Sequence, residues 1–461
     1  MLFHCTPQIN NYFIFKLYHI LESVDIIKER DTKNGYGDEN LKKYITTERT
    51  NLFEPNSIIT MKFSIEGTDL SDNEIERAVY AAMEANEVLN SKVILSADGQ
   101  AWYEKCETQN NKVVVSDMQW EEVFYTQIKI RFHIEEGELI RVFILGNKDK
   151  KTILIMAHHL AGDGKSTVYF IEDIMNALSG KQVLYKEMTI LSAEKLPKSS
   201  KLPLISKAYA NYYNYSWKRK GKAFSIDDIK RVHDIYWKQH KTMISIEHFS
   251  SKELKQLIKE AREANVKLTS YIIAAFCELM PVKISTGLAV DGRTDGNRSM
   301  GNQATGISVD YKYNKRLGFS QNARVIQKKI DKKLQSSWKK YFVLKFMSLL
   351  NGSLVDSVYM YLAGIYKDNR IAKLAKVLGY SEVHRDLSIT NLTKLDIQNK
   401  YGAYSIKEFL FVPPIIAYGK RLIGIATLGD EMYISYHLME NAETDAELKY
   451  FNKVMERLKK L

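Results

Sequence analysis

The pattern of hydrophobic and polar residues switches along the chain between alternation at every second residue and spacing at every third or fourth. Residues 57–66, SIITMKFSIE, alternate as in a strand, and residues 70–89 follow helical spacing behind the capping box Ser71-x-x-Glu74. Further strand-like runs cover 92–96, 128–134, 139–145 and 152–158, and a helix is expected over 166–178. Strands and helices interleaved in this way predict an α/β fold with mixed sheets.

The same pattern restarts in the second half of the chain. Residues 243–249, MISIEHF, alternate as in a strand, and Ser250-x-x-Glu253 caps a helix that runs to about residue 264. The stretches 153–175 and 434–455 also share one order, which is strand, His-Leu, loop and helix, so that His159-Leu160 aligns with His437-Leu438. Two echoes in the same order predict two lobes of one architecture.

The length of 461 residues exceeds one ordinary core and fits these two lobes. Residues 341–366 are strongly apolar but contain Lys345 and Asp356, which predicts a buried helix and no transmembrane segment. We divide the chain into an N-terminal extension (1–50), a first lobe (51–185), a basic connector (186–241) and a second lobe (242–461).

Three cysteines, Cys5, Cys106 and Cys277, are too few and too widely spaced for a disulfide framework. No signal peptide is recognisable, so we expect a cytoplasmic protein. The net charge of +12 is spread along the chain without any nucleic-acid-binding motif, which argues against a nucleic-acid partner. An anionic small molecule or an acidic partner protein would be attracted equally well.

Residues 156–170, MAHHLAGDGKSTVYF, allow two readings. Gly164-Lys165-Ser166 ends like a phosphate-binding loop, but His159 stands where the first glycine of that loop is required. A helix cap at Ser166 or Thr167 accounts for the same residues. The phosphate-loop reading is therefore the weaker one.

The other reading is the motif His158-His159-x-x-x-Asp163-Gly164, which suits acyl transfer because a neutral histidine can take the proton of an attacking acceptor near pH 7. Neighbouring residues at a strand end point to opposite sides, so only one of the two histidines faces a given substrate. Asp163 has the spacing to orient an imidazole as in a triad. Diverging side chains rarely converge on one ion, and we expect no metal.

On these residues the sequence resembles the condensation-domain-like, CoA-dependent acyltransferase superfamily, which includes chloramphenicol acetyltransferase and alcohol acetyltransferases. Residues 290–293, Val-Asp-Gly-Arg, followed by Gly301-Asn302, match a second family block. Residues 388–394, SITNLTK, resemble a later segment, with Thr393 where glycine is usual. The resemblance spans about residues 55 to 460 and implies two chloramphenicol-acetyltransferase-like lobes with an active-site tunnel between them.

The resemblance also implies roles for individual residues. It assigns the general base to His159 and pairs Asp163 with Arg293 as a structural clamp. The implied reaction moves an acyl group from acyl-CoA, or from another phosphopantetheine thioester, to a hydroxyl group of a small or lipid-like acceptor, without a tightly bound cofactor. The remaining residues are His158 and Gly164 in the active site, and Gly301, Asn302 and Asn391 in substrate binding.

Two alternatives stay open. The first is a stand-alone condensation enzyme of the nonribosomal-peptide type, which takes its acyl group from an acyl carrier protein and forms an amide or an ester; the Ser-x-Ala-Gln-x-Arg block of such domains is missing from this sequence. The second is a non-catalytic relative that binds a ligand or a partner. The intact His159, Asp163, Gly164 and Arg293 argue against it, but Thr393 and the unusual first fifty residues keep it open.

Overall fold

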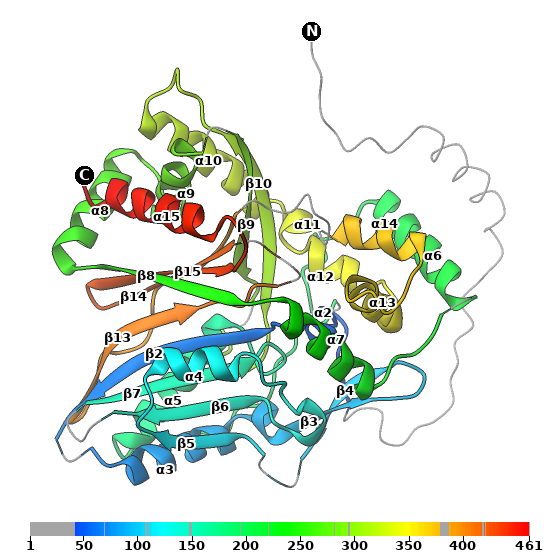
Figure 1. Cartoon of the computed structure of the whole chain (residues 1–461), viewed down its shortest axis with the longest axis horizontal. Coiled ribbons are helices and arrows are strands. Elements are labelled where there is room, and N and C mark those ends of the chain that lie inside the picture. Colours follow the sequence, from blue (N-terminus) through cyan, green and yellow to red (C-terminus); the bar gives the residue numbers. More distant parts are fainter. Residues whose placement is uncertain are drawn as a thin grey trace. The chain divides into compact units, whose positions relative to one another are not determined.

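The computed structural model describes residues 42–460, apart from positions 69, 107, 109, 147–149, 194, 220, 281, 294–295, 379–386, 417, 418 and 420. The compact unit begins at Lys43, so residues 43–50, assigned above to the N-terminal extension, are part of it. The rest of that extension lies outside the described residues. Two six-stranded mixed sheets and their helices (Figure 1) confirm the expected α/β class.

The first sheet has the strand order β12-β13-β2-β7-β6-β5. β2 and β7 pair antiparallel along their full length, from Ile58 opposite His158 to Glu66 opposite Lys150. Helix α3 (Asp72–Ala85) packs on β6 and on α5 (Gly164–Leu178), and the residues of β6 and most of those of β7 are buried. The strands are β2 (Ile58–Glu66), β5 (Lys112–Ser116), β6 (Ile140–Leu145), β7 (Lys150–His158), β12 (Lys400–Tyr401) and β13 (Tyr404–Val412).

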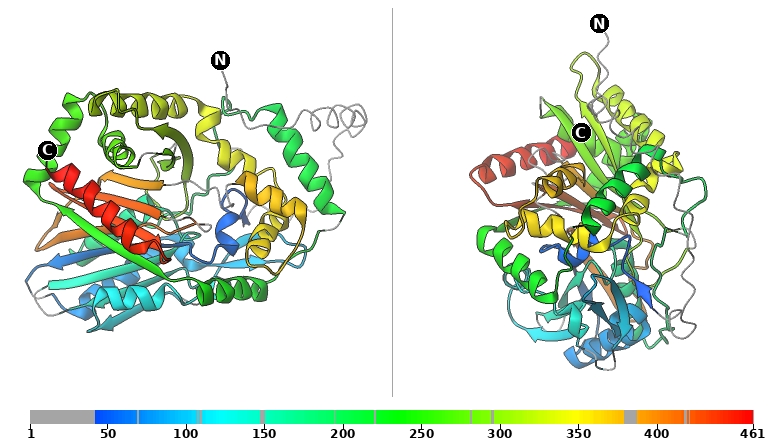
Figure 2. Two further views of the ribbon diagram at one scale, coloured as in Figure 1. Left: turned by 45° about the horizontal axis from the view of Figure 1, so that its top comes forward. Right: turned by 90° about the vertical axis from the view of Figure 1, so that its right-hand side faces the viewer.

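The second sheet has the order β10-β9-β11-β14-β15-β8, and β11 runs parallel to both of its neighbours. Helix α15 (Thr444–Lys459) contacts β8 and β15, and Figure 2 shows it in red across the strands. Helices α8 (Ser251–Glu263), α9 (Leu268–Glu278) and α10 (Phe319–Leu334) complete the same core. The strands are β8 (Thr242–Phe249), β9 (Lys283–Asp291), β10 (Ala304–Lys312), β11 (Leu387–Lys394), β14 (Arg421–Leu428) and β15 (Glu431–Met439).

Strand β13 crosses from the second half of the chain into the first sheet. It pairs antiparallel with β2, with Phe411 opposite Met61, although β11 and β14 on either side of it in sequence belong to the second sheet. The expected division of the chain at residues 185 and 241 stays a prediction, but the sheets do not follow it.

The basic connector carries two helices, α6 (Leu204–Lys218) and α7 (Ile226–Gln239), and the latter leads directly into β8. The expected buried helix over 341–366 is two helices, α12 (Phe342–Met347) and α13 (Gly352–Leu362). Asp356 of α13 is fully buried and accepts hydrogen bonds from Arg49 Nε at 2.8 Å and Nη2 at 2.5 Å. None of the helices in the described ranges is both long and apolar enough to cross a bilayer.

The strand expected over residues 128–134 is wrong. Helix α4 (Trp120–Gln127) ends there, and the chain turns into the short helix η3 (Ile134–Glu136). The guanidinium of Arg141 donates to the carbonyls of Ile130 at 3.0 Å and Arg131 at 2.8 Å, so these carbonyls are not available to a strand partner. Ile128, Phe132 and Ile134 of this stretch are buried, but in a turn, whereas Ile130 is exposed.

The remaining elements are short or peripheral. β1 pairs with β4, and β4 with β3, in the small third sheet. Their bounds, with those of the other helices, are β1 (Lys43–Tyr44), β3 (Ser91–Leu95), β4 (Ala101–Lys105), α2 (Thr50–Phe53), η2 (Glu87–Asn90), α11 (Ser337–Lys340) and α14 (Asn369–Leu378).

Candidate functional site

The two histidines of the motif stand at the end of strand β7. His158 is the last residue of the strand. The backbone N–H of His159 donates to the carbonyl of Ser57 at 2.7 Å and so continues the pairing with β2 by one residue. The N–H of Ala161 then donates to the carbonyl of His158 at 2.7 Å and closes a tight turn. This turn fixes the backbone on both sides of His159.

His158 is held inside the protein. Its Nδ1 accepts from the backbone N–H of Leu160 at 3.2 Å, so its proton resides on Nε2, which lies 3.0 Å from Ser57 Oγ. Burial, with the neighbouring His159 and Arg141 as further contributors, lowers the pKa of His158 to about 3. The ring is therefore neutral and fixed in one tautomer, which suits a structural role.

The residue His159 is partly exposed, and its Nδ1 is buried without a hydrogen-bond partner among the described residues. Burial lowers the pKa of His159, while the negative charge of Asp163 opposes this shift. The imidazole is consequently neutral at pH 7, which is the state that a general base requires.

Asp163 is the N-cap of helix α5 and has three partners. Its Oδ1 accepts from the backbone N–H of Ser166 at 2.9 Å and from Arg293 Nη2 at 3.1 Å, and its Oδ2 accepts from the backbone N–H of Gln303 at 2.8 Å. Both carboxylate oxygens are thus engaged away from the ring of His159. The geometry is that of the clamp expected with Arg293, and not that of a triad.

The side chain that caps helix α5 is Asp163, and the expected cap at Ser166 or Thr167 is wrong. Ser166 occupies the third helical position, and its Oγ accepts from the N–H of Asp163 at 2.9 Å, which completes a capping box. Lys165 Nζ lies 3.0 Å from Asp291 Oδ2. The residues that resemble the end of a phosphate-binding loop therefore serve a helix start and an ion pair.

Arg293 joins the motif to the second family block. Its Nη1 lies 3.1 Å from Asp291 Oδ1, in addition to its pair with Asp163, and its side chain is only 4% exposed. The two carboxylates raise the already high pKa of Arg293 against the opposing effect of burial. Buried pairs of this kind cost much stability when one partner is removed.

Three further site residues lie around this clamp. A Cβ on Gly164 would lie 3.0 Å from Leu392 Cδ2 and 3.2 Å from Phe411 Cζ, so a side chain at the first turn of α5 would force these two neighbours to shift. Gly301 has a φ of +142°, and a Cβ there would lie 2.7 Å from the carbonyl oxygen of Thr189. Asn302 Oδ1 accepts from the N–H of Ala304 at 3.2 Å. Their expected part in substrate binding stays a prediction.

Asn391 lies on β11 and makes hydrogen bonds to two threonines. Its Nδ2 donates to Thr269 Oγ1 at 2.9 Å, and its Oδ1 accepts from the N–H of Thr393 at 2.7 Å. Thr393 has a φ of +60°, in the left-handed region that glycine adopts most easily. The chain thus keeps the backbone conformation of a glycine position with a threonine in it.

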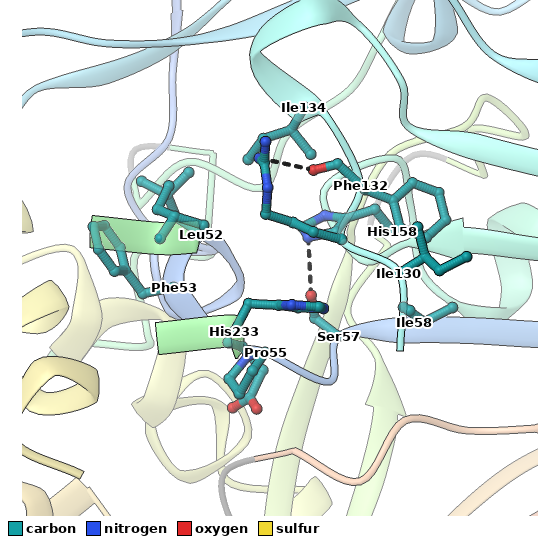
Figure 3. A pocket seen from close by; sticks show the side chains of 13 residues that line it. Leu52, Phe53, Pro55, Ser57, Ile58, Ile130, Phe132, Ile134, His158 and His233 are labelled. Carbon is teal, nitrogen blue, oxygen red and sulfur yellow. Dashed lines mark hydrogen bonds between the residues drawn. The ribbon is translucent and has the colours of Figure 1, made fainter. Parts of the chain in front are cut away.

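A cavity of about 20 Å³, large enough for about one water molecule, lies behind the motif. Figure 3 shows His158 and His233 facing each other across it, with Ser57 between them. Both nitrogens of His233 are buried without a hydrogen-bond partner among the described residues, and burial lowers the pKa of His233 to about 4. The cavity contacts the structural histidine, and His159 is not among the residues that line it.

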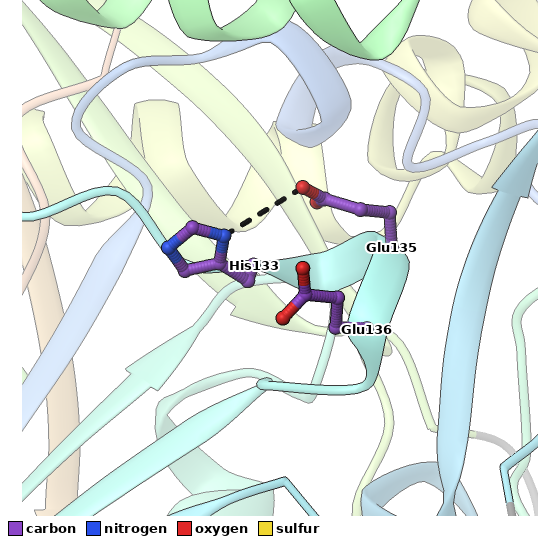
Figure 4. A group of neighbouring side chains, drawn as sticks. All are labelled: His133, Glu135 and Glu136. Carbon is purple, nitrogen blue, oxygen red and sulfur yellow. Dashed lines mark ion pairs between the residues drawn. The ribbon is translucent and has the colours of Figure 1, made fainter.

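One cluster in the described part of the chain has a metal-ligating composition. His133, Glu135 and Glu136, shown in Figure 4, place one ligand atom each within 4.8 Å of one another. Arg131 donates to both carboxylate oxygens of Glu135, at 2.6 and 2.8 Å, and its charge would repel a cation. We therefore assign no metal to this cluster, and it lies outside the motif.

Sequence reasoning missed Tyr103, which contacts the motif, and Glu48, which contacts Tyr103. Tyr103 Oη lies 2.8 Å from the carbonyl oxygen of Leu160 and 2.8 Å from Glu48 Oε1. Both residues are buried, and neither stands in a recognisable pattern, so only their contacts in space reveal them.

The fold has clear relatives among solved structures. Trichothecene 15-O-acetyltransferase from Fusarium sporotrichioides is 12% identical, with a TM-score of 0.62, and the match covers 92% of this chain and 98% of that one. Polyketide synthase associated protein 5 from Mycobacterium tuberculosis is 13% identical, with a TM-score of 0.60 and coverage of 91% and 98%. The condensation domain of the Monacolin K polyketide synthase MokA is 12% identical, with a TM-score of 0.59 and coverage of 90% and 97%.

No protein-family model matches the sequence, and no curated protein matches it. Identities of 12–13% show the fold alone. The chain therefore has the fold of condensation domains and of an O-acetyltransferase, as the resemblance implied.

Proposed function

We propose that this protein is an acyltransferase that moves an acyl group from a thioester, with acyl-CoA as the donor, to a hydroxyl group of a small or lipid-like acceptor. The observation that carries the proposal is the neutral, partly exposed His159, set on a backbone that is fixed on both sides. Its neighbour His158 is hydrogen-bonded to Ser57, and Asp163 is paired with Arg293, so these residues have structural roles. His159 is thus the group of the motif that is free for chemistry.

In the proposed reaction His159 accepts the proton of the acceptor hydroxyl as its oxygen attacks the thioester carbonyl. The tetrahedral intermediate then collapses, the C–S bond breaks, and the imidazolium returns the proton to the departing thiolate. No residue of the chain is acylated, because donor and acceptor are bound together.

The condensation domains among the structural relatives favour a second candidate, in which the acyl group arrives on a carrier protein. The full-length chain is therefore incubated with acetyl-CoA, and in parallel with an acetylated carrier protein, and release of the free thiol is followed. The proposal expects slow thiol release from acetyl-CoA, accelerated by alcohols and lost in His159→Gln.

Release from the carrier protein alone would favour the condensation enzyme instead. Release that is the same in His159→Gln as in the wild type would refute His159 as the base. A complete absence of release from both donors, with a panel of alcohols and amines, would favour the non-catalytic relative.

A further inference from the structure

Glu48 is a buried carboxyl group close to the motif that the proposed reaction does not use. It is 4% exposed, and its Oε1 lies 2.8 Å from Tyr103 Oη. The same hydroxyl lies 2.8 Å from the carbonyl oxygen of Leu160, the residue that follows His159. A chain of two short contacts therefore leads from Glu48 to the turn that carries His159.

The number of available protons determines which group donates in each of these two hydrogen bonds. A tyrosine hydroxyl has one proton, and the carbonyl of Leu160 can only accept. If Tyr103 donates to Leu160, the contact with Glu48 needs a proton from the carboxyl group. Burial raises the pKa of Glu48 to about 8, against the lowering effect of the Tyr103 hydrogen bond, so that this proton is present at neutral pH.

The charged groups around Glu48 favour the same state. Asp163, at the start of α5, is the charged neighbour that acts on it, and its negative charge opposes ionisation of Glu48. Arg293 is already paired with Asp163 and Asp291. The second oxygen of Glu48, Oε2, is buried without a hydrogen-bond partner among the described residues, so an ionised carboxylate would be poorly solvated.

We infer that protonated Glu48 is a positioning residue, which through Tyr103 holds the carbonyl of Leu160 and thereby the backbone of His159. This inference rests on the proposed role of His159. When Glu48 loses its proton, Tyr103 turns its own proton toward the carboxylate and releases Leu160. Glu48 thereby sets an alkaline limit on turnover that no residue of the family motif would produce.

The variant Glu48→Gln tests this, because its amide can donate to Tyr103 but does not ionise. In the wild type, turnover falls as the pH rises through about 8, to roughly a tenth at about pH 9. In Glu48→Gln this alkaline fall disappears, while turnover at pH 7 is retained. In Tyr103→Phe, kcat falls at every pH with KM little changed, and the matched control Tyr401→Phe, another buried tyrosine, behaves as the wild type.

A second readout does not depend on turnover. A carboxyl group whose pKa is raised by folding contributes stability below the unfolded value of 4.5, and this stability is lost as the pH rises toward about 8. The melting temperature of Glu48→Gln relative to the wild type therefore increases from pH 5 to pH 8.

The two readouts separate the two proposals. The inference would be overturned if the difference in melting temperature between Glu48→Gln and the wild type were the same at pH 5 and pH 8. It would also be overturned if turnover of the wild type did not fall at alkaline pH, or if this fall persisted in Glu48→Gln. If the melting temperatures behave as expected but no thioester is consumed at any pH, the proposed function fails and the positioning role fails with it, while the protonation of Glu48 stands.

Discussion

The two strand-and-helix units, β7 with α5 and β15 with α15, share an order but not a chemistry. His437 lies inside β15 and is 1% exposed, with Nδ1 2.8 Å from the carbonyl of Pro413 and Nε2 2.5 Å from Thr242 Oγ1. His158 likewise places its Nε2 against a hydroxyl, that of Ser57, where the neighbouring strand begins. By these contacts His437 is the counterpart of His158.

The alignment of His159-Leu160 with His437-Leu438 is therefore one residue out of register. That alignment matches residue types only. When His437 is aligned with His158, Leu438 of the second unit takes the position of His159. The buried histidine is thus common to both units, whereas the second histidine is present in the first unit only.

The helix starts differ in the same sense. α5 begins at Asp163 with a capping box and the clamp to Arg293, whereas α15 begins at Glu443 without a side-chain cap. The loop between strand and helix thus distinguishes the candidate active unit from its structural copy.

The largest expected effect separates the two histidines. We expect His159→Gln to lower turnover about 10²- to 10⁴-fold, because it removes the base, and to leave the unfolding free energy almost unchanged. His437→Gln, its matched control, should leave turnover near the wild-type value while lowering stability, because its two buried hydrogen bonds are altered. Initial rates and urea unfolding of both variants check this. Equal losses of turnover would show that His159 and His437 do not differ in their roles.

The next effect concerns the two helix starts. We expect Asp163→Asn to lower the unfolding free energy by about 3 kcal/mol, since Arg293 loses its buried charged partner, and to lower turnover with it. Glu443→Gln changes the same position of α15, which is exposed, and should shift stability by no more than about 0.5 kcal/mol. Similar values for both variants in urea unfolding would show that the clamp contributes nothing specific.

The smallest effect tests what the two units share. Burial lowers the pKa of His158 to about 3 and that of His437 to about 4, so both stay neutral in the folded protein, whereas the unfolded chain takes up protons below about pH 6.5. Each histidine thus contributes stability above pH 6.5 that is lost as the pH falls, about 2 kcal/mol at pH 5.

His158→Phe and His437→Phe should each remove this dependence. The difference in unfolding free energy between pH 7 and pH 5 then becomes about 2 kcal/mol smaller than in the wild type. Chemical unfolding at the two pH values measures it, and a variant with the wild-type dependence would show that its histidine is protonated in the folded state.

Local patterns predicted the strands with regular alternation of apolar and polar residues, such as β2, β7 and β8. They also predicted helix α8, which has helical spacing behind a capping box. The pair of Asp163 and Arg293 was predicted only through the resemblance to the acyltransferase superfamily, because the two residues lie far apart in the sequence and no local pattern joins them. The turn at 128–134 was mistaken for a strand because its geometry is set by Arg141, outside the local window. Glu48 and Tyr103 were missed for the same reason, since their role arises from contacts between distant segments.

Strand β13 also restricts how the two sheets can move. It pairs with β2 in the first sheet, and its Phe411 carbonyl accepts from Ser435 Oγ of the second sheet at 2.6 Å. A hinge motion that swung the two sheets apart would have to break this strap. We therefore expect ligands to enter and leave without separation of the two sheets, and a single cut in the loop before β13 should leave β13 paired with β2.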